Sequence, residues 1–263
     1  MRLLTFSIIT VVKNDEKNIE KTIKSVIKNK SKNVEYIIIN GNSNDKTLLK
    51  IRKYKRSIDK IITGKDKGIY DAMNKGIKYS KNDVIVFCNS GDFFYDKAIK
   101  KISNVFGAKN VDYVFGTVVR NYTKKKIIKY KLNPNRIFYN FDFATAHSTG
   151  FFLKKKIYKK IGPYDIQFKC SSDYDLYLRL IKGGYKGAVT NKKNLIGNVA
   201  SGGFSSKISF LDHLIEESKI RVKNKQNLLL ILIIFINSYL KNIFKNLFYI
   251  FFKIFHDLRN LKI

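Results

Sequence analysis

The sequence predicts an α/β fold in which helices flank a mostly parallel central sheet. Short apolar runs rich in β-branched residues alternate with helix-periodic segments through the first 90 residues, and this alternation is typical of parallel βαβ units. The run Val84-Ile85-Val86-Phe87 is continuously apolar, as expected of a strand that is covered on both faces. Polar loops follow these runs. Since ligands bind at the carboxyl ends of parallel strands, the loops are the first candidates for a functional site.

The first half of the chain supplies four predicted strands and three predicted helices. The strands are expected at residues 6–12, 35–39, 58–63 and 83–87, and the helices over 15–28, after 45 and over 70–79. In the first helix Ile19, Ile23 and Val26 recur on one face. Ser43 or Asp45 is a suitable cap for the second helix, so the polar loop after the second strand leads directly into it.

The second half is less regular. Strand-like runs occur at 111–120, at 126–132 and from Phe151-Phe152, a loop is expected at 146–150, a helix over 173–182, and a Gly- and Ser-rich stretch lies at 201–206. We find no internal repeat and no linker long enough to separate two catalytic domains. We therefore expect one α/β domain over residues 1–206 and a helical carboxyl-terminal segment over residues 207–263.

The charge of the chain is strongly positive. Among its 263 residues, 52 Lys and Arg against 20 Asp and Glu give a formal net charge of +32. Most of the excess is lysine scattered among Asn and Ile, without a basic recognition helix, a zinc finger or an RNA-binding signature. This pattern argues against nucleic acid as a partner and suits an anionic membrane surface.

Two features indicate the cytoplasm. Cys88 and Cys170 are too few for a disulfide framework and lack a Cys/His cluster for zinc, so both are predicted to be core residues in a reducing compartment. The amino-terminal run is basic and then apolar like a weak signal peptide, but Thr5, Ser7 and Thr10 interrupt it and no small-residue cleavage site follows. We expect a first strand there and a protein that stays in the cytoplasm.

An acidic loop, Asn89-Ser90-Gly91-Asp92, follows the strand at 83–87. A divalent cation that bridges a diphosphate takes only one or two protein carboxylates, and Asp92 fits that role. Gly91 would let the backbone approach phosphate closely, while Asn89 and Ser90 offer neutral hydrogen bonds. The alternative interpretation is a simple turn in which Asp92 caps a following helix.

A second acidic group, Ser172-Asp173-Tyr174-Asp175, opens the helix predicted over 173–182. The dipole at a helix amino terminus favours the ionised form of a carboxyl, so Asp173 could accept a proton as a general base. The alternative is that Ser172 or Asp173 serves as an N-terminal cap, which is common.

Five stretches together resemble glycosyltransferase family 2. They are residues 6–12, the loop at 40–47, DKGIYDAMNKG at 66–76, NSGD at 89–92 and SDYD at 172–175. The similarity extends over residues 5–206, is most specific in DKGIYDAMNKG, and is greatest to bacterial enzymes of capsule, colanic-acid and O-antigen assembly. The resemblance implies a GT-A fold, which is Rossmann-like. It also implies a nucleotide-diphospho-sugar donor, Mn²⁺ or Mg²⁺ as cofactor, and inversion at the anomeric carbon.

The resemblance also implies roles for single residues. Asp92 falls on the metal-binding acidic motif and Asp173 on the catalytic base, while Asp175 orients the helix start or the acceptor. The implied donor-binding residues are Thr10, Asn14, Asn40, Asp66, Lys67, Tyr70, Asn74, Asn89, Ser90 and Gly91. The family often has Asp where this chain has Asn40. An amide oxygen can still accept a hydrogen bond from a base, so a UDP-sugar is favoured while selectivity among bases stays open.

Two further elements have both a functional and a structural interpretation. His147 precedes the Phe151 strand, where related sequences place a histidine near the sugar or acceptor, but a lone histidine is often structural. Gly203 and Ser205 match a Gly/Ser element that follows the last core strand of the family. Such a loop could close over donor or acceptor, or it could be a flexible exit from the domain.

The carboxyl-terminal segment has the pattern of an amphipathic helix. From residue 228 it carries an apolar, aromatic stripe that runs from Ile236 to Leu258, with Lys241 and Lys245 on the other face. The uninterrupted apolar run 228–236 is shorter than the roughly 20 residues of a transmembrane span. We expect a helix that lies in the membrane interface and holds the enzyme near a lipid-linked acceptor; packing on the domain or on a second copy is the alternative.

The sequence therefore favours a metal-dependent inverting glycosyltransferase, of the hexosyltransferase type, in cell-surface polysaccharide biosynthesis. It would be peripheral on the cytoplasmic face of the membrane and act on a glycan or lipid-linked acceptor. A nucleotidyltransferase would place a glycine- and lysine-rich phosphate loop after the first strand, which Lys13-Asn14-Asp15 does not supply. A basic membrane-binding protein without catalysis is the remaining alternative.

Overall fold

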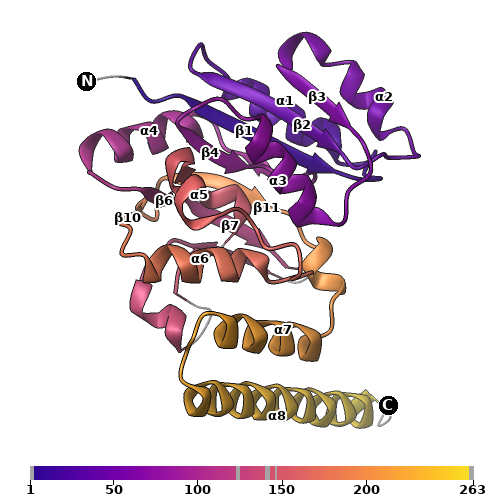
Figure 1. Cartoon of the computed structure of the whole chain (residues 1–263). Coiled ribbons are helices and arrows are strands. Elements are labelled where there is room, and N and C mark those ends of the chain that lie inside the picture. The colour runs from indigo at the N-terminus through magenta and orange to yellow at the C-terminus, as the bar shows by residue number, and fades with distance from the viewer. Residues whose placement is uncertain (1–2, 123–124, 140–142, 146, 261–263) are drawn as a thin grey trace. The chain divides into compact units, whose positions relative to one another are not determined.

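The computed structural model describes residues 3–122, 125–139, 143–145 and 147–260. It divides into two compact units, Met1–Lys207 and Ile208–Ile263, which are described separately. Figure 1 shows the first unit as layers of helices and strands and the second as a pair of helices.

The first half of the larger unit follows the predicted alternation of strands and helices. Its elements are β1 (Phe6–Val12), α1 (Ile19–Lys28), β2 (Val34–Asn40), α2 (Thr47–Arg52), β3 (Lys60–Thr63), α3 (Ile69–Tyr79) and β4 (Val84–Phe87). The first helix begins four residues later than predicted. Asn14 has a left-handed backbone with φ 50°, and the N–H groups of Asn18 and Ile19 bond to the carbonyl of Asp15 in a turn.

The second half contains more elements than the sequence predicted. Its strands are β5 (Phe93–Phe94), β6 (Tyr113–Phe115), β7 (Thr117–Asn121), β8 (Lys126–Lys129), β9 (Phe151–Lys154), β10 (Gly187–Val189) and β11 (Leu195–Val199), and its α-helices are α4 (Ala98–Ala108), α5 (Lys155–Ile161) and α6 (Ser172–Lys182). Short 3₁₀ turns are η1 (Lys55–Ser57), η2 (Pro134–Phe138), η3 (Ser148–Gly150) and η4 (Phe204–Lys207). The strand β5 directly follows Asp92, so the interpretation of this residue as a helix cap is wrong.

The strands form two sheets. The larger has the order β10-β6-β9-β4-β1-β2-β3, in which β4, β1, β2 and β3 are parallel and β9 is antiparallel to both of its neighbours. The smaller has the order β5-β11-β7-β8. This arrangement confirms the predicted α/β fold with a mostly parallel central sheet, and it is GT-A-like.

One predicted strand is wrong in a way that matters for the site. The run 111–120 is not a single strand, because it breaks at Gly116 into β6 of the large sheet and β7 of the small one. A Cβ on Gly116 would lie within 3.0 Å of three side-chain atoms of Ile196 in β11. Glycine is therefore required where the chain passes from one sheet to the other.

The core of the larger unit lies on the central strands. Every residue of β1 and β4 is buried, and so are the predicted core positions Ile19, Ile23 and Val26 of α1. The helix α3 packs on β1 and β2, and Gly76 gives it room, since a Cβ there would lie 2.5 Å from Cγ2 of Ile9. Because α3 carries most of the DKGIYDAMNKG stretch, this packing fixes that motif against the carboxyl ends of the strands.

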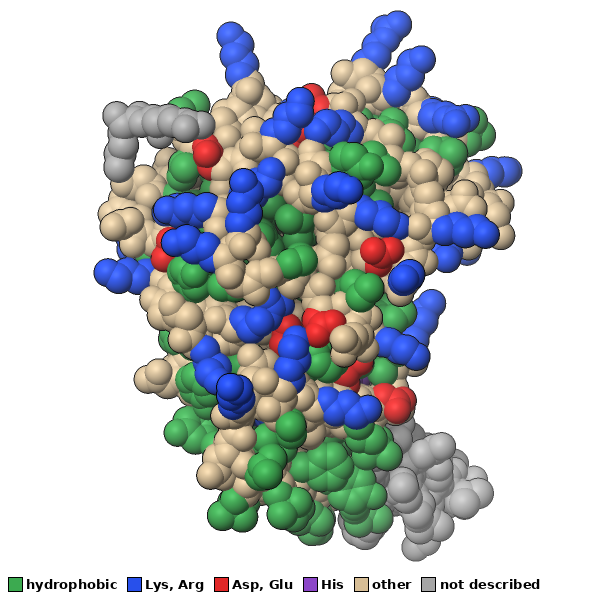
Figure 2. Space-filling model, viewed as in Figure 1, with side chains coloured by type: hydrophobic (Ala, Val, Ile, Leu, Met, Phe, Trp, Pro, Cys, Tyr) green, Lys and Arg blue, Asp and Glu red, His purple; other side chains and the backbone are tan. Residues whose placement is uncertain are grey.

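The smaller unit consists of α7 (Phe210–Lys223) and α8 (Leu228–Asn260), which pack on each other. Large hydrophobic side chains are exposed along α8, as Figure 2 shows; they are Leu228, Leu229, Leu232, Ile233, Ile236, Tyr239, Leu240, Phe244, Leu247 and Phe248. Judged by length and composition alone, Leu228–Lys245 could cross a membrane, and 6% of this window is buried. The part of the predicted stripe beyond Phe248 lies outside the described side chains.

Candidate active site

The loop Asn89-Ser90-Gly91-Asp92 is held at the carboxyl end of β4 by hydrogen bonds from other elements. The Gly91 N–H donates to Oγ1 of Thr22 at 3.0 Å, and the Ser90 hydroxyl donates to Oδ2 of Asp15 at 2.6 Å. Gly91 has a φ of +95°, which favours glycine. Asn89 donates from Nδ2 to Oγ of Ser148, but its buried Oδ1 has no hydrogen-bond partner. Since a buried oxygen without a partner is costly, this atom is a candidate to contact a ligand.

The carboxyl of Asp92 is buried and held from two sides. Its Oδ2 accepts a hydrogen bond from Oγ1 of Thr149 at 2.5 Å, and its Oδ1 accepts one from the N–H of Ala200 at 2.9 Å. Burial raises the pKa of Asp92 to about 6, although both hydrogen bonds and the charge of Arg120 act to lower it. Asp92 therefore sits where η3 and the segment after β11 meet the end of β4.

The side-chain oxygens of Asp92 and Asn89 suit a cation that takes most of its ligands from a bound substrate. In the part of the chain that the structure describes, no group of three or more His, Cys, Asp and Glu side chains could hold a metal by itself. A hard cation on a diphosphate takes most of its ligands from phosphate and water, and one or two from protein carboxylates. One carboxylate, from Asp92, and the unpartnered amide oxygen of Asn89 match that donor set.

His147 lies beside this carboxyl. Its Nδ1 is 3.8 Å from Oδ2 of Asp92 and accepts a hydrogen bond from the N–H of Thr149 at 3.3 Å. Burial, with a smaller contribution from the positive charge of Arg120, lowers the pKa of His147 to about 3. The ring is therefore neutral near pH 7 with its hydrogen on Nε2, and the His147–Asp92 contact is not an ion pair.

Arg120 is a charged residue of this region that the sequence reasoning missed. It is partly exposed near the end of β7, and it pairs with Val199 of β11, one residue before the Ala200 that donates to Asp92. Its charge acts on both Asp92 and His147. The sequence signal for Arg120 was its position at the end of an apolar strand-like run. Because the run was predicted as a single strand, it did not reveal that Arg120 pairs with a strand that leads to Asp92.

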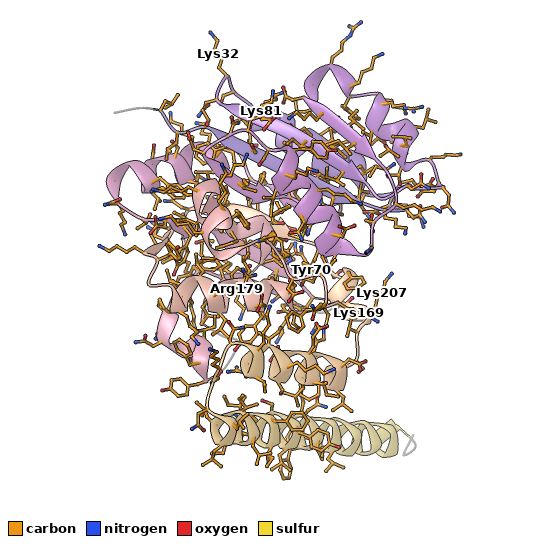
Figure 3. All side chains as sticks on the ribbon, viewed as in Figure 1. Lys32, Tyr70, Lys81, Lys169, Arg179 and Lys207 are labelled. Carbon is orange, nitrogen blue, oxygen red and sulfur yellow. The ribbon has the colours of Figure 1, made fainter. Side chains whose placement is uncertain are left out.

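The other acidic candidate, Asp173, lies in the first turn of α6. The hydroxyl of Tyr70 is 3.3 Å from its Oδ1 and 3.0 Å from the carbonyl oxygen of Cys170. Figure 3 shows Tyr70 between α3 and α6. The N–H of Tyr174 also donates to Oδ1 of Asp173, at 2.9 Å. The structure thus joins two stretches that the sequence singled out separately.

Asp175 has a different environment from Asp173. It is fully buried, and its Oδ2 accepts a hydrogen bond from Nε of Arg179 at 2.8 Å. Arg179, labelled on α6 in Figure 3, donates in turn to the carbonyls of Ile161, Gly162 and Pro163. Asp175 is therefore linked through Arg179 to the loop after α5, and it offers no exposed oxygen to an acceptor.

Three of the predicted donor-binding residues have their polar atoms engaged within the protein. Thr10 is fully buried, and its hydroxyl donates to the carbonyl of Cys88 at 2.7 Å. The side-chain oxygen of Asn40 accepts a hydrogen bond from Oγ of Ser43 at 2.6 Å. Asn74 donates to and accepts from the backbone of Tyr164, at 2.8 and 3.0 Å. These residues shape the loops that surround the site.

Asn14 connects two of the loops. Its N–H donates to Oγ of Ser43 and its side-chain oxygen accepts from the N–H of Asn44, both at 2.9 Å. Asp66 reaches the same region, because a Cβ on Gly41 would lie 2.2 Å from its Oδ2. The loops after β1, β2 and β3 therefore meet here.

Two of the remaining candidates, Lys67 and Gly203, are exposed. The side chain of Lys67 faces solvent, while its N–H donates to Oδ2 of Asp71. Gly203 is also exposed and accepts hydrogen bonds from the N–H and Oγ of Ser206, within the turn that η4 continues. The side chain of Ser205 lies outside the described residues.

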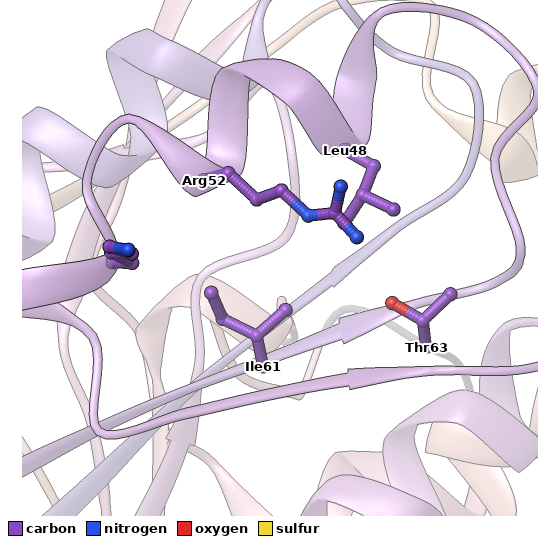
Figure 4. A pocket seen from close by; sticks show the side chains of 5 residues that line it. Leu48, Arg52, Ile61 and Thr63 are labelled. Carbon is purple, nitrogen blue, oxygen red and sulfur yellow. The ribbon is translucent and has the colours of Figure 1, made fainter.

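A pocket of about 490 Å³ lies beside the edge strand β3. Figure 4 shows it between α2 and β3, lined by Leu48, Arg52, Lys55, Ile61 and Thr63. Thr63 accepts a weak hydrogen bond from Nδ2 of Asn40 at 3.4 Å, so the pocket adjoins the loop after β2. None of the residues that line this pocket was predicted from the sequence to be a site residue.

The fold and these loops define a glycosyltransferase domain, and the comparisons agree. The chain belongs to glycosyl transferase family 2, whose profile matches residues 7–172. An uncharacterized glycosyltransferase of Mycobacterium tuberculosis is 28% identical over 179 residues, which are 66% of this chain and 68% of that protein. A PGL/p-HBAD biosynthesis glycosyltransferase of Mycobacterium bovis is 22% identical over 150 residues, 55% of this chain and 57% of that protein.

Solved structures show the same fold. The complex of S. aureus TarS 1-349 with UDP-GlcNAc aligns with a TM-score of 0.70 and 15% identity over 90% of this chain and 73% of that one. The mannosyltransferase PcManGT of Pyrobaculum calidifontis, in complex with GDP-Man and Mn²⁺, aligns with a TM-score of 0.64 and 12% identity over 91% and 70%.

Proposed function

We propose that the protein moves a sugar from a nucleotide-diphospho-sugar to a glycan or lipid-linked acceptor with inversion at the anomeric carbon. The observation that carries this proposal is the position of Asp173 in the first turn of α6, bonded by Tyr70 from the DKGIYDAMNKG motif. Family membership supports the reaction class, and the Asn89–Asp92 loop supplies the second acidic site.

In this mechanism Asp173 takes the proton of an acceptor hydroxyl. The acceptor oxygen attacks the anomeric carbon from the face opposite the nucleotide, and the bond from that carbon to the diphosphate oxygen breaks with its electron pair on the diphosphate. A helix amino terminus favours a carboxylate over the neutral acid, which suits Asp173 to accept this proton. A single displacement inverts the anomeric centre and needs no covalent intermediate.

Asp92 and the amide oxygen of Asn89 would hold Mn²⁺ or Mg²⁺ together with the donor diphosphate. Such a cation, when bound, screens the diphosphate charge and stabilises the leaving group. Thr149 and Ala200 fix the orientation of the Asp92 carboxyl, so their hydrogen bonds position this ligand in advance. The complex of PcManGT with Mn²⁺ supports a divalent cation in this fold.

We propose UDP as the nucleotide of the donor. The complex of TarS with UDP-GlcNAc supports this choice, while PcManGT binds GDP-Man on the same fold. Asn40 has its oxygen engaged by Ser43, so base recognition would depend on neighbouring groups of the same loops, including Asp66 and the backbone near Gly41.

The helix α8 supports a proposal for the acceptor and the location. Its exposed apolar side chains and its lysines Lys241 and Lys245 suit a helix in an anionic membrane interface. We propose that this helix holds the enzyme on the cytoplasmic face of the membrane, where a lipid-linked acceptor of cell-surface polysaccharide assembly is within reach. The capsule, colanic-acid and O-antigen enzymes that the sequence resembles support this setting.

Calorimetric binding of UDP-, GDP- and dTDP-sugars to the full chain, with and without Mn²⁺, tests the donor and the metal. We expect one donor to bind in a metal-dependent manner and Asp92→Asn to abolish the metal dependence. If no donor binds, even with membrane vesicles present, the enzyme proposal fails and the alternative of a membrane-binding protein without catalysis gains support.

A further inference from the structure

We propose that Arg120 is a phosphate-binding residue of the active site. The inference rests on the proposed function and deepens it, because it names a substrate contact on the small sheet that no sequence motif marks. Its basis is the face of the small sheet on which Arg120 lies, its pairing beside the segment that bonds Asp92, and the absence, among the described residues, of a carboxylate within 4.0 Å of its guanidinium.

The face of the small sheet that carries Arg120 packs on η3. Side chains alternate along a strand, so Val118 and Arg120 of β7 point to the same face. A Cβ on Gly150 would lie 2.7 Å from Cγ1 of Val118, and one on Gly197 of β11 would lie 2.7 Å from Cγ2 of Thr149. This face therefore covers η3, which carries the Thr149 that donates to Asp92.

The strand pairing brings Arg120 next to the Asp92 carboxyl. Arg120 pairs with Val199, and the next residue, Ala200, donates its N–H to Oδ1 of Asp92 at 2.9 Å. Among the described residues, no carboxylate oxygen lies within 4.0 Å of the Arg120 guanidinium, and its ring contact is with Tyr122, 5.7 Å from the centroid. The positive charge of Arg120 therefore acts on the Asp92 carboxyl, but the hydrogen bonds of that carboxyl come from Thr149 and Ala200.

In the described part of the chain, the guanidinium of Arg120 has no hydrogen bond or ion pair to a carboxylate, so its donors are available to a ligand. Asp92 already accepts two hydrogen bonds, and His147 is neutral. A guanidinium presents five N–H donors in a planar fork that suits phosphate oxygens, and it stays charged at any physiological pH. A phosphate group in this position would accept hydrogen bonds from the fork in a bidentate manner.

Two parts of the substrates could supply that phosphate. One is the diphosphate of the donor, which also lies at the Asn89–Asp92 loop in the proposed mechanism. The other is the phosphate of a lipid-linked acceptor, since Arg120 lies on the small sheet while the loops after β1, β2 and β3 belong to the large one. Both have the same chemistry toward Arg120, and their contributions can be measured separately.

The test compares Arg120→Met and Arg120→Lys with wild type in binding UDP, GDP and the corresponding monophosphates, measured by calorimetry with Mg²⁺ present. Lys126→Met is the matched control, because Lys126 is an exposed cation of the neighbouring strand β8. We expect Arg120→Met to weaken diphosphate binding about tenfold or more while monophosphate binding stays within about twofold. Arg120→Lys should be intermediate, because a lysine keeps the charge and loses the fork.

Kinetics with acceptors that contain or lack a phosphate distinguish the two sources. If diphosphate binding is unchanged but the KM for the phosphate-containing acceptor rises about tenfold, Arg120 binds the acceptor phosphate. If neither the diphosphate affinity nor the acceptor KM changes in variants that melt at the same temperature as wild type, Arg120 does not bind phosphate, and the proposed function still stands. A wild-type protein that binds no nucleoside diphosphate contradicts the proposed function itself. Should Arg120→Met fail to fold, Arg120→Lys decides between the first two results.

Discussion

The hydroxyl of Tyr70 lies 3.3 Å from Oδ1 of Asp173, a carboxylate 103 residues further along the chain. Tyr70 is buried, and burial together with the Asp173 charge raises its pKa well above the ordinary value, so it remains a hydrogen-bond donor. Its single hydrogen is shared between Asp173 and the carbonyl of Cys170. The DKGIYDAMNKG stretch thereby supports the candidate base directly.

Removing this hydroxyl should impair catalysis without preventing donor binding. Tyr70→Phe keeps the ring, which stacks on Tyr164 with centroids 5.3 Å apart, and takes away only the hydrogen bond. We expect kcat to fall about tenfold with the donor KM within about twofold, since a hydrogen bond to a charged group contributes about 1.5–3 kcal/mol. Steady-state kinetics check this. An unchanged kcat would show that Tyr70 does not position the base.

Asp173→Asn should abolish transfer and leave the nucleotide site intact. A general base contributes about 10²- to 10⁴-fold, and an amide cannot accept the acceptor proton. We expect a kcat loss within that range and a dissociation constant for the nucleotide within about twofold of wild type. Calorimetry and a transfer assay on the same preparation measure both, and near-normal turnover would remove Asp173 from the mechanism.

Asp175→Asn should destabilise the fold instead. It leaves Arg179 largely buried without its carboxylate, and breaking a buried pair in this way costs about 3–5 kcal/mol. Lys75→Gln is the control, because it breaks the more exposed Lys75–Asp71 pair of α3, which should cost less than about 1 kcal/mol. Urea unfolding of both variants makes the comparison. Equal losses of unfolding free energy would contradict the structural role of Asp175.

Gly41→Ala should weaken nucleotide binding with little change in stability. The new Cβ would lie 2.2 Å from Oδ2 of Asp66, and the flexible carboxylate would move away. We expect the dissociation constant of the nucleotide to rise about three- to tenfold, which corresponds to about 0.7–1.4 kcal/mol. Gly64→Ala is the control, since a Cβ there meets nothing within 4 Å. Equal nucleotide affinities in the two variants would show that the nucleobase does not bind next to Asp66.

Ile236→Glu should reduce partitioning of the protein onto anionic vesicles. Ile236 is 48% exposed in the apolar stripe of α8, and burial of such a side chain contributes about 1.5–3 kcal/mol. We expect a loss of about tenfold or more in a sedimentation assay. Asn237→Glu adds the same charge without removing apolar surface and should lose much less. Equal effects would show that charge alone governs the binding.

The part of the fold that follows from local pattern was predictable. The strand β1 has the predicted bounds, and β2, β3, β4, α3 and α6 differ from prediction by one or two residues, because periodicity and buried apolar runs define them. The strands β10 and β11 were missed because they are short and depend on pairing with β6 and β7. The break at Gly116 depends on contact with Ile196, which sequence spacing does not reveal.

The candidate site was predictable as a set of loops but not as a set of contacts. The resemblance located the loops around Asp92 and Asp173, and His147 does lie next to Asp92. It could not show that Thr10 is hydrogen-bonded to the backbone of Cys88 and Asn74 to the backbone of Tyr164, because those partners are distant in sequence. Arg120 was missed for the same reason.

The stereochemistry of the product decides most directly whether this enzyme is an inverting glycosyltransferase with Asp173 as its base. The full chain, with membrane vesicles that contain a lipid-linked acceptor, is given the donor that binds in calorimetry, and the anomeric configuration of the product is read by proton NMR in wild type and Asp173→Asn. We expect a product with the opposite anomeric configuration to the donor, formed about 10²- to 10⁴-fold more slowly by the variant. A product with retained configuration, or equal turnover by Asp173→Asn, would contradict this mechanism.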